Sequence, residues 1–164
     1  MNNNELLLLY GSNIIKIKEL VLSGASVNYE SPEGLTPLAC AESVEVADFL
    51  IKRGADVNAM NSDGKTALFS VSNLDTCRFL IESGASVNSL NDKNETALFY
   101  TSDMNKIRLL IEAGCDPLVR NAMGLRHYDL LNDALKVRFV NFLANRKKKL
   151  EQLKSEPYSV ALSF

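Results

Sequence analysis

The residues that could carry chemistry are few and lie far apart in the sequence. His127 is the single histidine, and the cysteines are Cys40, Cys77 and Cys115. A catalytic nucleophile needs a base and a group that orients that base, and structural zinc takes four His or Cys ligands, often in CxxC pairs. The cysteines lack CxxC spacing, and one histidine leaves no obvious ligand set. We therefore expect a non-enzymatic protein with no catalytic residues, metal or cofactor, and we interpret His127 as structural.

Other kinds of site find no support either. The sequence lacks the GxxxxGK[ST] and GxGxxG loops that bind nucleotide phosphates. Three widely spaced cysteines are an odd number, which favours buried free thiols in a reducing compartment over a disulfide framework. No run approaches the roughly eighteen apolar residues of a membrane span. We expect a cytoplasmic protein whose N-terminus is neither a signal peptide nor an anchor.

The charge is uneven along the chain. Residues 1–100 carry 7 Lys+Arg against 13 Asp+Glu, a net −6, whereas residues 101–164 carry 11 against 7, a net +4. The acidic part could steer a basic partner, although such charge also serves solubility. The overall charge of −2 gives no case for nucleic-acid binding.

Two motifs repeat with a period of 30 residues. The first reads S-G-A-S-V-N at 23–28, R-G-A-D-V-N at 53–58, S-G-A-S-V-N at 83–88 and A-G-C-D at 113–116. The second reads G-L-T-P-L at 34–38, G-K-T-A-L at 64–68 and N-E-T-A-L at 94–98, with a degenerate copy, G-L-R-H-Y, at 124–128. Two motifs that share one period indicate a repeat architecture.

Each repeat predicts a pair of helices. Threonines at one position of the motif are suited to cap a short first helix with the hydroxyl, namely Thr36, Thr66 and Thr96. Preferred N-cap residues recur seven positions later and predict the starts of the second helices: Asn13, Ser43, Asn73, Asp103 and Asp133. Apolar residues at i, i+3, i+6 and i+7 give each second helix one buried face, and glycines end it at Gly24, Gly54, Gly84 and Gly114. The polar residues that follow suit hairpin arms.

The motifs at 34–38 and 50–58 resemble the ankyrin repeat, and the resemblance covers roughly residues 5 to 145. It implies an all-α solenoid of stacked helix pairs with projecting hairpin loops, which binds other proteins on a concave side formed by hairpin tips and first helices. The usual repeat is about 33 residues long. Each unit here is three residues shorter, which predicts truncated first helices or joining turns.

The expected domain, residues 1–145, holds about five units: an N-terminal cap at 5–34, inner units at 35–64, 65–94 and 95–124, and a C-terminal cap at 125–145. Lys16 and Glu19 replace Val46 and Phe49 of the next unit, as an end exposed to water requires. Residues 146–164 are expected to form a basic helical extension and an apolar tail. Docking of that tail on the solenoid is favoured over disorder.

The resemblance places the partner-binding residues on the hairpin tips and first helices, as a stripe across the repeats. Its members are Tyr29, Glu33, Leu35, Met60, Asp63, Lys65, Phe69, Leu90, Asp92, Lys93, Glu95, Phe99, Tyr100, Arg120, Met123 and Leu125. The aromatic residues among them could be binding hot spots, or Phe69 and Phe99 could fill space left by the missing residues.

We expect a protein–protein interaction module, monomeric when free, that scaffolds or inhibits a partner protein. A toxin-neutralising immunity protein is one such role. The alternatives are a bacterial effector acting on a host protein, and binding of nucleic acid or a membrane surface through the basic run at 146–149.

Overall fold

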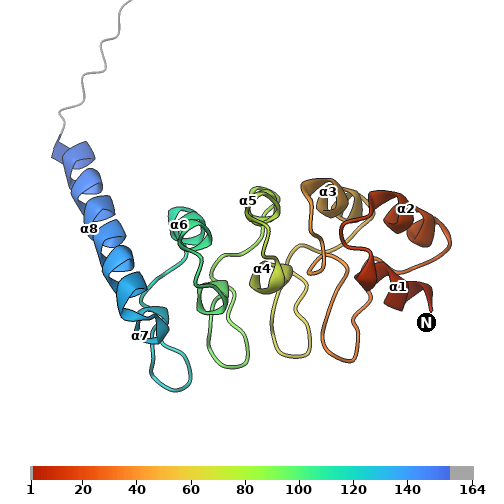
Figure 1. The fold of residues 1–164 in the computed structure, drawn as a ribbon, viewed down its shortest axis with the longest axis horizontal. Coiled ribbons are helices and arrows are strands. Elements are labelled where there is room, and N and C mark those ends of the chain that lie inside the picture. Colours follow the sequence, from red (N-terminus) through yellow and green to blue (C-terminus); the bar gives the residue numbers. More distant parts are fainter. Residues whose placement is uncertain (1, 156–164) are drawn as a thin grey trace, which may run out of the picture. The chain divides into compact units, whose positions relative to one another are not determined.

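The computed structural model describes the backbone of residues 2–155 and the side chains of residues 2–148. The elements are α1 (Asn3–Leu9), α2 (Ile14–Leu22), α3 (Val44–Lys52), α4 (Ala67–Ser70), α5 (Leu74–Glu82), the 3-10 helix η1 (Ala97–Tyr100), α6 (Met104–Glu112), α7 (His127–Leu130) and α8 (Asp133–Ser155) (Figure 1). The described residues contain no β-strand, only one isolated bridge between Arg120 and Arg126. The all-helical prediction is confirmed. The apolar tail at 158–164 lies outside the described residues.

The chain divides into two units, Met1–Leu130 and Leu131–Phe164. The first unit contains every element up to α7, and the second contains α8. Because α8 runs without interruption from Asp133 to Ser155, the boundary expected between residues 145 and 146 lies inside a helix.

The second helices begin where the side chains predict. Asn13, Ser43 and Asn73 each accept a hydrogen bond from the amide three residues later, at 3.0, 3.3 and 2.9 Å. Asp103 accepts from the amide of Asn105 at 2.9 Å. The fifth cap was predicted wrongly: Asn132, not Asp133, accepts from an amide of the first turn of α8 at 2.9 Å.

After α1, which has seven residues, the first helices of the later repeats are short. α4, η1 and α7 have four residues each, and residues 37–40 form only a turn. Thr36 accepts from the amide of Ala39 at 3.2 Å as predicted, but the hydroxyls of Thr66 and Thr96 cap nothing. In these tight turns the amide three residues later bonds the threonine carbonyl instead, at 3.1 and 3.0 Å.

The core of the first unit consists of the predicted apolar columns of the second helices. Ten of these side chains are at most 5% exposed: Ile17, Leu20, Ala47, Leu50, Cys77, Leu80, Met104, Ile107, Leu110 and Ile111. The chain turns after each helix at a glycine with positive φ, such as Gly54 at 93°. A different glycine, Gly11, permits close packing between repeats, since a Cβ there would lie 1.9 Å from the Cys40 carbonyl oxygen.

Asparagines join the successive repeats in a ladder along the chain. The side-chain amides of Asn28, Asn58 and Asn88 each donate, at 3.0 Å, to the carbonyl of the helix-ending glycine one repeat later. Each Oδ1 accepts from the backbone amide two residues beyond that glycine, at 2.8 to 3.1 Å. The position that would extend the ladder is Leu118, which is 64% exposed.

Candidate functional site

The hairpin arms of the first unit project on the opposite side from the second helices (Figure 1). One polar side chain shapes each arm: Ser31, Asn61, Asn91 and Asn121. Its oxygen accepts from the amides two and four residues later, at 2.9 to 3.2 Å. Sequence reasoning missed this column, although its 30-residue recurrence was a usable signal.

Neighbouring arms are hydrogen-bonded to one another at their tips. The amide of Ser62 donates to Glu30 Oε1 at 2.8 Å. The amide of Asp92 donates to the Asp63 carbonyl at 3.0 Å, and that of Ala122 donates to the Lys93 carbonyl at 2.8 Å. The arms of the first unit therefore present their side chains as one row.

Most of the predicted binding stripe is accessible on this row. The exposed members are Glu33, Leu35, Met60, Asp63, Leu90, Asp92, Lys93, Tyr100, Arg120 and Met123, and the half-buried ones are Tyr29, Lys65, Glu95, Phe99 and Leu125. Met60 and Met123 are the most open apolar members, at 56% and 79%. Phe69 is only 4% exposed, so it offers no contact surface and is removed from the stripe.

Some aromatic residues of the stripe pack against other rings, and one of them is also exposed to solvent. Phe69 meets the ring of Tyr100 edge-on, with centroids 5.4 Å apart, and Phe99 meets the ring of His127 at 6.1 Å. Tyr100 itself is 39% exposed. The burial of Phe69 supports the space-filling interpretation for that residue, and Phe69 forms a base on which Tyr100 rests.

Five residues from the two successive repeats 65–94 and 95–124 form what we call the Tyr100 network: Lys65, Asn91, Glu95, Tyr100 and Asn121. The Tyr100 hydroxyl donates to Glu95 Oε2 at 2.9 Å and accepts from Asn91 Nδ2 at 2.8 Å. Asn121 Nδ2 donates to Glu95 Oε1 at 3.1 Å, and Lys65 Nζ lies 4.9 Å from the centre of the Tyr100 ring. The network holds a half-exposed aromatic side chain in one orientation.

The network also shifts the pKa values of its titratable members. Partial burial alone would raise the pKa of Glu95, but the hydrogen bonds from Asn91, Asn121 and Tyr100 outweigh burial and lower it. Burial and the neighbouring Glu95 raise the pKa of Tyr100. Burial opposes the charge of Lys65, yet its ion pair with Asp63 at 3.2 Å and the contact with Tyr100 raise its pKa. At neutral pH the network therefore holds a carboxylate, a phenol and an ammonium group.

Comparison with known families agrees with this repeat geometry. A sequence model described as ankyrin repeats (3 copies) matches residues 8–91 and again residues 40–121, together more than half of the chain. The chain belongs to the ankyrin-repeat family. A search of curated proteins gave no significant match. Ankyrin repeats are typically non-catalytic and bind other proteins.

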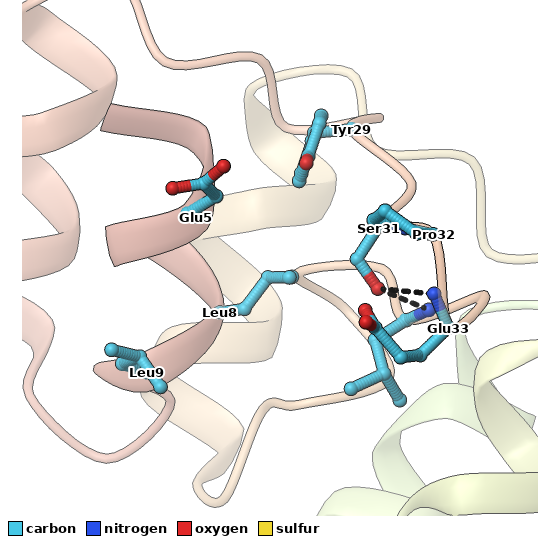
Figure 2. Close-up of a pocket in the computed structure, with 8 residues that line it drawn as sticks. Glu5, Leu8, Leu9, Tyr29, Ser31, Pro32 and Glu33 are labelled. Carbon is cyan, nitrogen blue, oxygen red and sulfur yellow. Dashed lines mark hydrogen bonds between the residues drawn. The ribbon is translucent and has the colours of Figure 1, made fainter. Parts of the chain in front are cut away.

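The ankyrin repeats also form a pocket of about 390 Å³ where α1 faces the first hairpin arm (Figure 2). Its lining consists of Glu5, Leu8, Leu9, Tyr29, Ser31, Pro32, Glu33 and Leu35. Three of these, Tyr29, Glu33 and Leu35, belong to the predicted stripe, whereas sequence reasoning missed the three from α1. The leucine run at 6–9 was a signal, because more leucines occur there than one buried face of a seven-residue helix can use.

His127 and the three cysteines are buried or half-buried within the ankyrin repeats. His127 is 2% exposed, and burial lowers its pKa to about 4. Cys77 and Cys115 are buried, Cys40 is half-buried rather than buried as predicted, and burial raises the pKa of all three thiols. Within residues 2–148, no group of three or more His, Cys, Asp and Glu side chains could hold a metal ion. In the same part of the chain, no helix is long and apolar enough to cross a membrane.

Proposed function

We propose that this ankyrin protein binds a partner protein along its hairpin stripe and acts by occluding or scaffolding that partner. The observation that carries the proposal is the Tyr100 network. A half-exposed tyrosine fixed at its hydroxyl and its ring loses little conformational freedom on binding, as an interface anchor should. Exposed Met60 and Leu90 on neighbouring arms supply further apolar contacts.

The net charge of residues 1–100 favours a basic partner. Glu33, Asp63 and Asp92 are exposed on successive arms, and residues 1–100 carry a net charge of −6. Such a surface attracts a positively charged protein and speeds its association. Neutralisation of a basic toxin, the role of an immunity protein, is the form of inhibition that this charge favours.

The first test is to recover the partner and then to vary the stripe. The full chain, tagged and expressed in its native cells, is used to capture proteins that mass spectrometry identifies. Tyr100→Ala and Met60→Asp should each weaken the captured complex at least tenfold, while Glu82→Ala on the outer face of α5 should leave it unchanged. If both stripe variants bind with unchanged affinity and are folded by circular dichroism, the stripe is excluded as the binding surface.

The same complex separates the alternatives. For a basic partner steered by the acidic arms, association should slow about tenfold between low and high salt. Deletion of residues 146–164 should leave the affinity unchanged. Loss of binding on that deletion would instead favour nucleic acid or a membrane surface bound through the basic run, and a partner found only in another organism's cells would favour an effector.

A further inference from the structure

The pocket between α1 and the first hairpin arm is distinct from the Tyr100 network and has its own chemistry. Leu8 projects from α1 toward the Ser31–Pro32–Glu33 turn (Figure 2). Leu9 and Leu35 are 66% and 40% exposed. A volume of about 390 Å³ lies at the small end of the range for ligand pockets, roughly 300 to 1,000 Å³. The pocket therefore suits a large side chain with its adjoining backbone.

The rim of this pocket is negative. Its lining contains two carboxylates, Glu5 and Glu33, and no basic side chain. Glu5 is held by the start of its own helix, where Oε2 accepts from the amide of Asn2 at 3.0 Å. Glu33 is exposed and forms no ion pair with another described residue. A ligand that buries apolar surface here gains further from a positive charge beside it.

Local hydrogen bonds shape both walls of the pocket. Ser31 is 8% exposed, and its hydroxyl accepts from the amides of Glu33 and Leu35, both at 3.2 Å (Figure 2). On the other wall, Asn2 and Glu5 form a reciprocal capping box at the start of α1. Binding therefore requires little ordering of the protein, which is a main cost of recognising a short peptide.

We propose that this pocket takes a short segment of the partner protein in which a large apolar side chain stands next to Lys or Arg. The apolar side chain packs among Leu8, Leu9 and Leu35, and the basic one pairs with Glu33. This inference rests on the proposed function and names the chemistry that the partner must carry. The chain's own apolar segment at 158–164 contains no Lys or Arg, so it offers nothing to the negative rim.

The test is an NMR titration of the ¹⁵N-labelled full chain with the blocked peptide G-S-F-R-S-G. The amides of Leu8, Tyr29, Glu33 and Leu35 should shift together. Peptides with F replaced by S, or with R replaced by E, should bind at least tenfold more weakly. Absence of these shifts at millimolar peptide, or equal binding of the R and E peptides, would overturn the proposal.

Charge reversal on the protein gives a matched pair of variants. Glu33→Lys should weaken G-S-F-R-S-G at least tenfold and should strengthen the peptide that carries E, while Glu82→Lys on the outer face of α5 should change neither. Equal affinity of wild type and Glu33→Lys would contradict the proposal. Shifts at the same amides that depend only on protein concentration would show that a second copy fills the pocket and would also overturn it.

The results distinguish a failure of the pocket proposal from a failure of the proposed function. If no peptide binds but Tyr100→Ala weakens the captured complex, the pocket inference is wrong and the stripe stands. If the peptide binds as expected but the stripe variants leave the complex intact, the stripe is wrong and the pocket stands.

Discussion

Tyr100 is exposed and yet held in place, and its neighbours in its own repeat and in the preceding one explain why. The ring packs on Phe69, while Glu95 and Asn91 hold the hydroxyl. Glu95 in turn accepts from Asn121 of the following hairpin arm. A side chain held in this way loses little conformational entropy when a partner binds it. Its contribution to binding therefore depends partly on residues that the partner need not touch.

Tyr100→Phe should lower the free energy of unfolding by about 0.5 to 1.5 kcal/mol, because Glu95 loses a donor and Asn91 loses an acceptor while the ring contacts remain. Urea denaturation followed by circular dichroism measures the change. Tyr29→Phe, at a half-buried tyrosine of the first arm, is the control and should change stability by less. Equal effects of the two substitutions would show that the hydroxyl of Tyr100 contributes nothing.

His127 should make stability depend on pH. Burial lowers its pKa from 6.5 to about 4. Between these pH values His127 is protonated in the unfolded chain and neutral in the folded chain. Its contribution is fully present above pH 6.5 and is lost as the pH falls to 4, up to about 3 kcal/mol.

In His127→Gln the free energy of unfolding should therefore decrease less than in the wild type as the pH is lowered from 6.5 to 4.5. Denaturation at several pH values measures this change. Glu95, whose folded pKa is lowered from 4.5, contributes a loss only below that pH. If the variant keeps the wild-type slope above pH 4.5, protonation of His127 does not carry the dependence.

At the scale of elements, side chains rather than strand pairing organise the loops. Asn28, Asn58 and Asn88 tie each loop to the next, and the Ser31 and Asn61 column shapes the arms from within. Both sets satisfy backbone groups that lie outside regular structure, at the ends of the second helices and within the arms. The stripe is ordered for this reason, although it is built from turns.

Asn58→Ala should destabilise the protein by about 1 to 2 kcal/mol, because the Gly84 carbonyl and the Ser86 amide both lose their side-chain partner. Hydrogen exchange at the Ser86 amide should accelerate more than exchange in α2. Asn105→Ala, on the exposed face of α6, should be neutral or slightly stabilising through helix propensity. Equal stability of the two variants would show that the ladder contributes no net free energy.

At the scale of the whole molecule, stability should vary along the first unit. In a solenoid each repeat is stabilised by its neighbours, so an end repeat has support on one side only. The first repeat leaves Leu9, Ile15 and Leu22 between 66% and 78% exposed. The inner repeats bury Cys77, Leu80 and Leu98 completely.

Native-state hydrogen exchange should therefore release α1 and α2 before α5 and α6. Mass spectrometry of peptic fragments measures the order, and the same chain in denaturant gives the intrinsic rates as the control. Exchange of all four helices together would show that the unit opens as a single cooperative block.

The sequence by itself determined the repeat period, the second helices with four of their five caps, the glycine stops and the family. These features are local, since a cap, a stop or an apolar face needs only residues within a few positions of one another. The row of exposed arm residues was also predictable, because repetition brings equivalent positions side by side. Counting residues also predicted that either the first helices or the joining turns are shortened, and the structure shows that the helices after α1 are short.

Only the tertiary structure decided how individual members of that row are used. Phe69 and Tyr100 lie at different positions of successive repeats, and one is buried while the other is displayed because their rings pack against each other across the repeat boundary. The pocket required α1 and the arm at 29–35, which contact each other only after folding. Such outcomes depend on distances between repeats, and no pattern within a single repeat contains them.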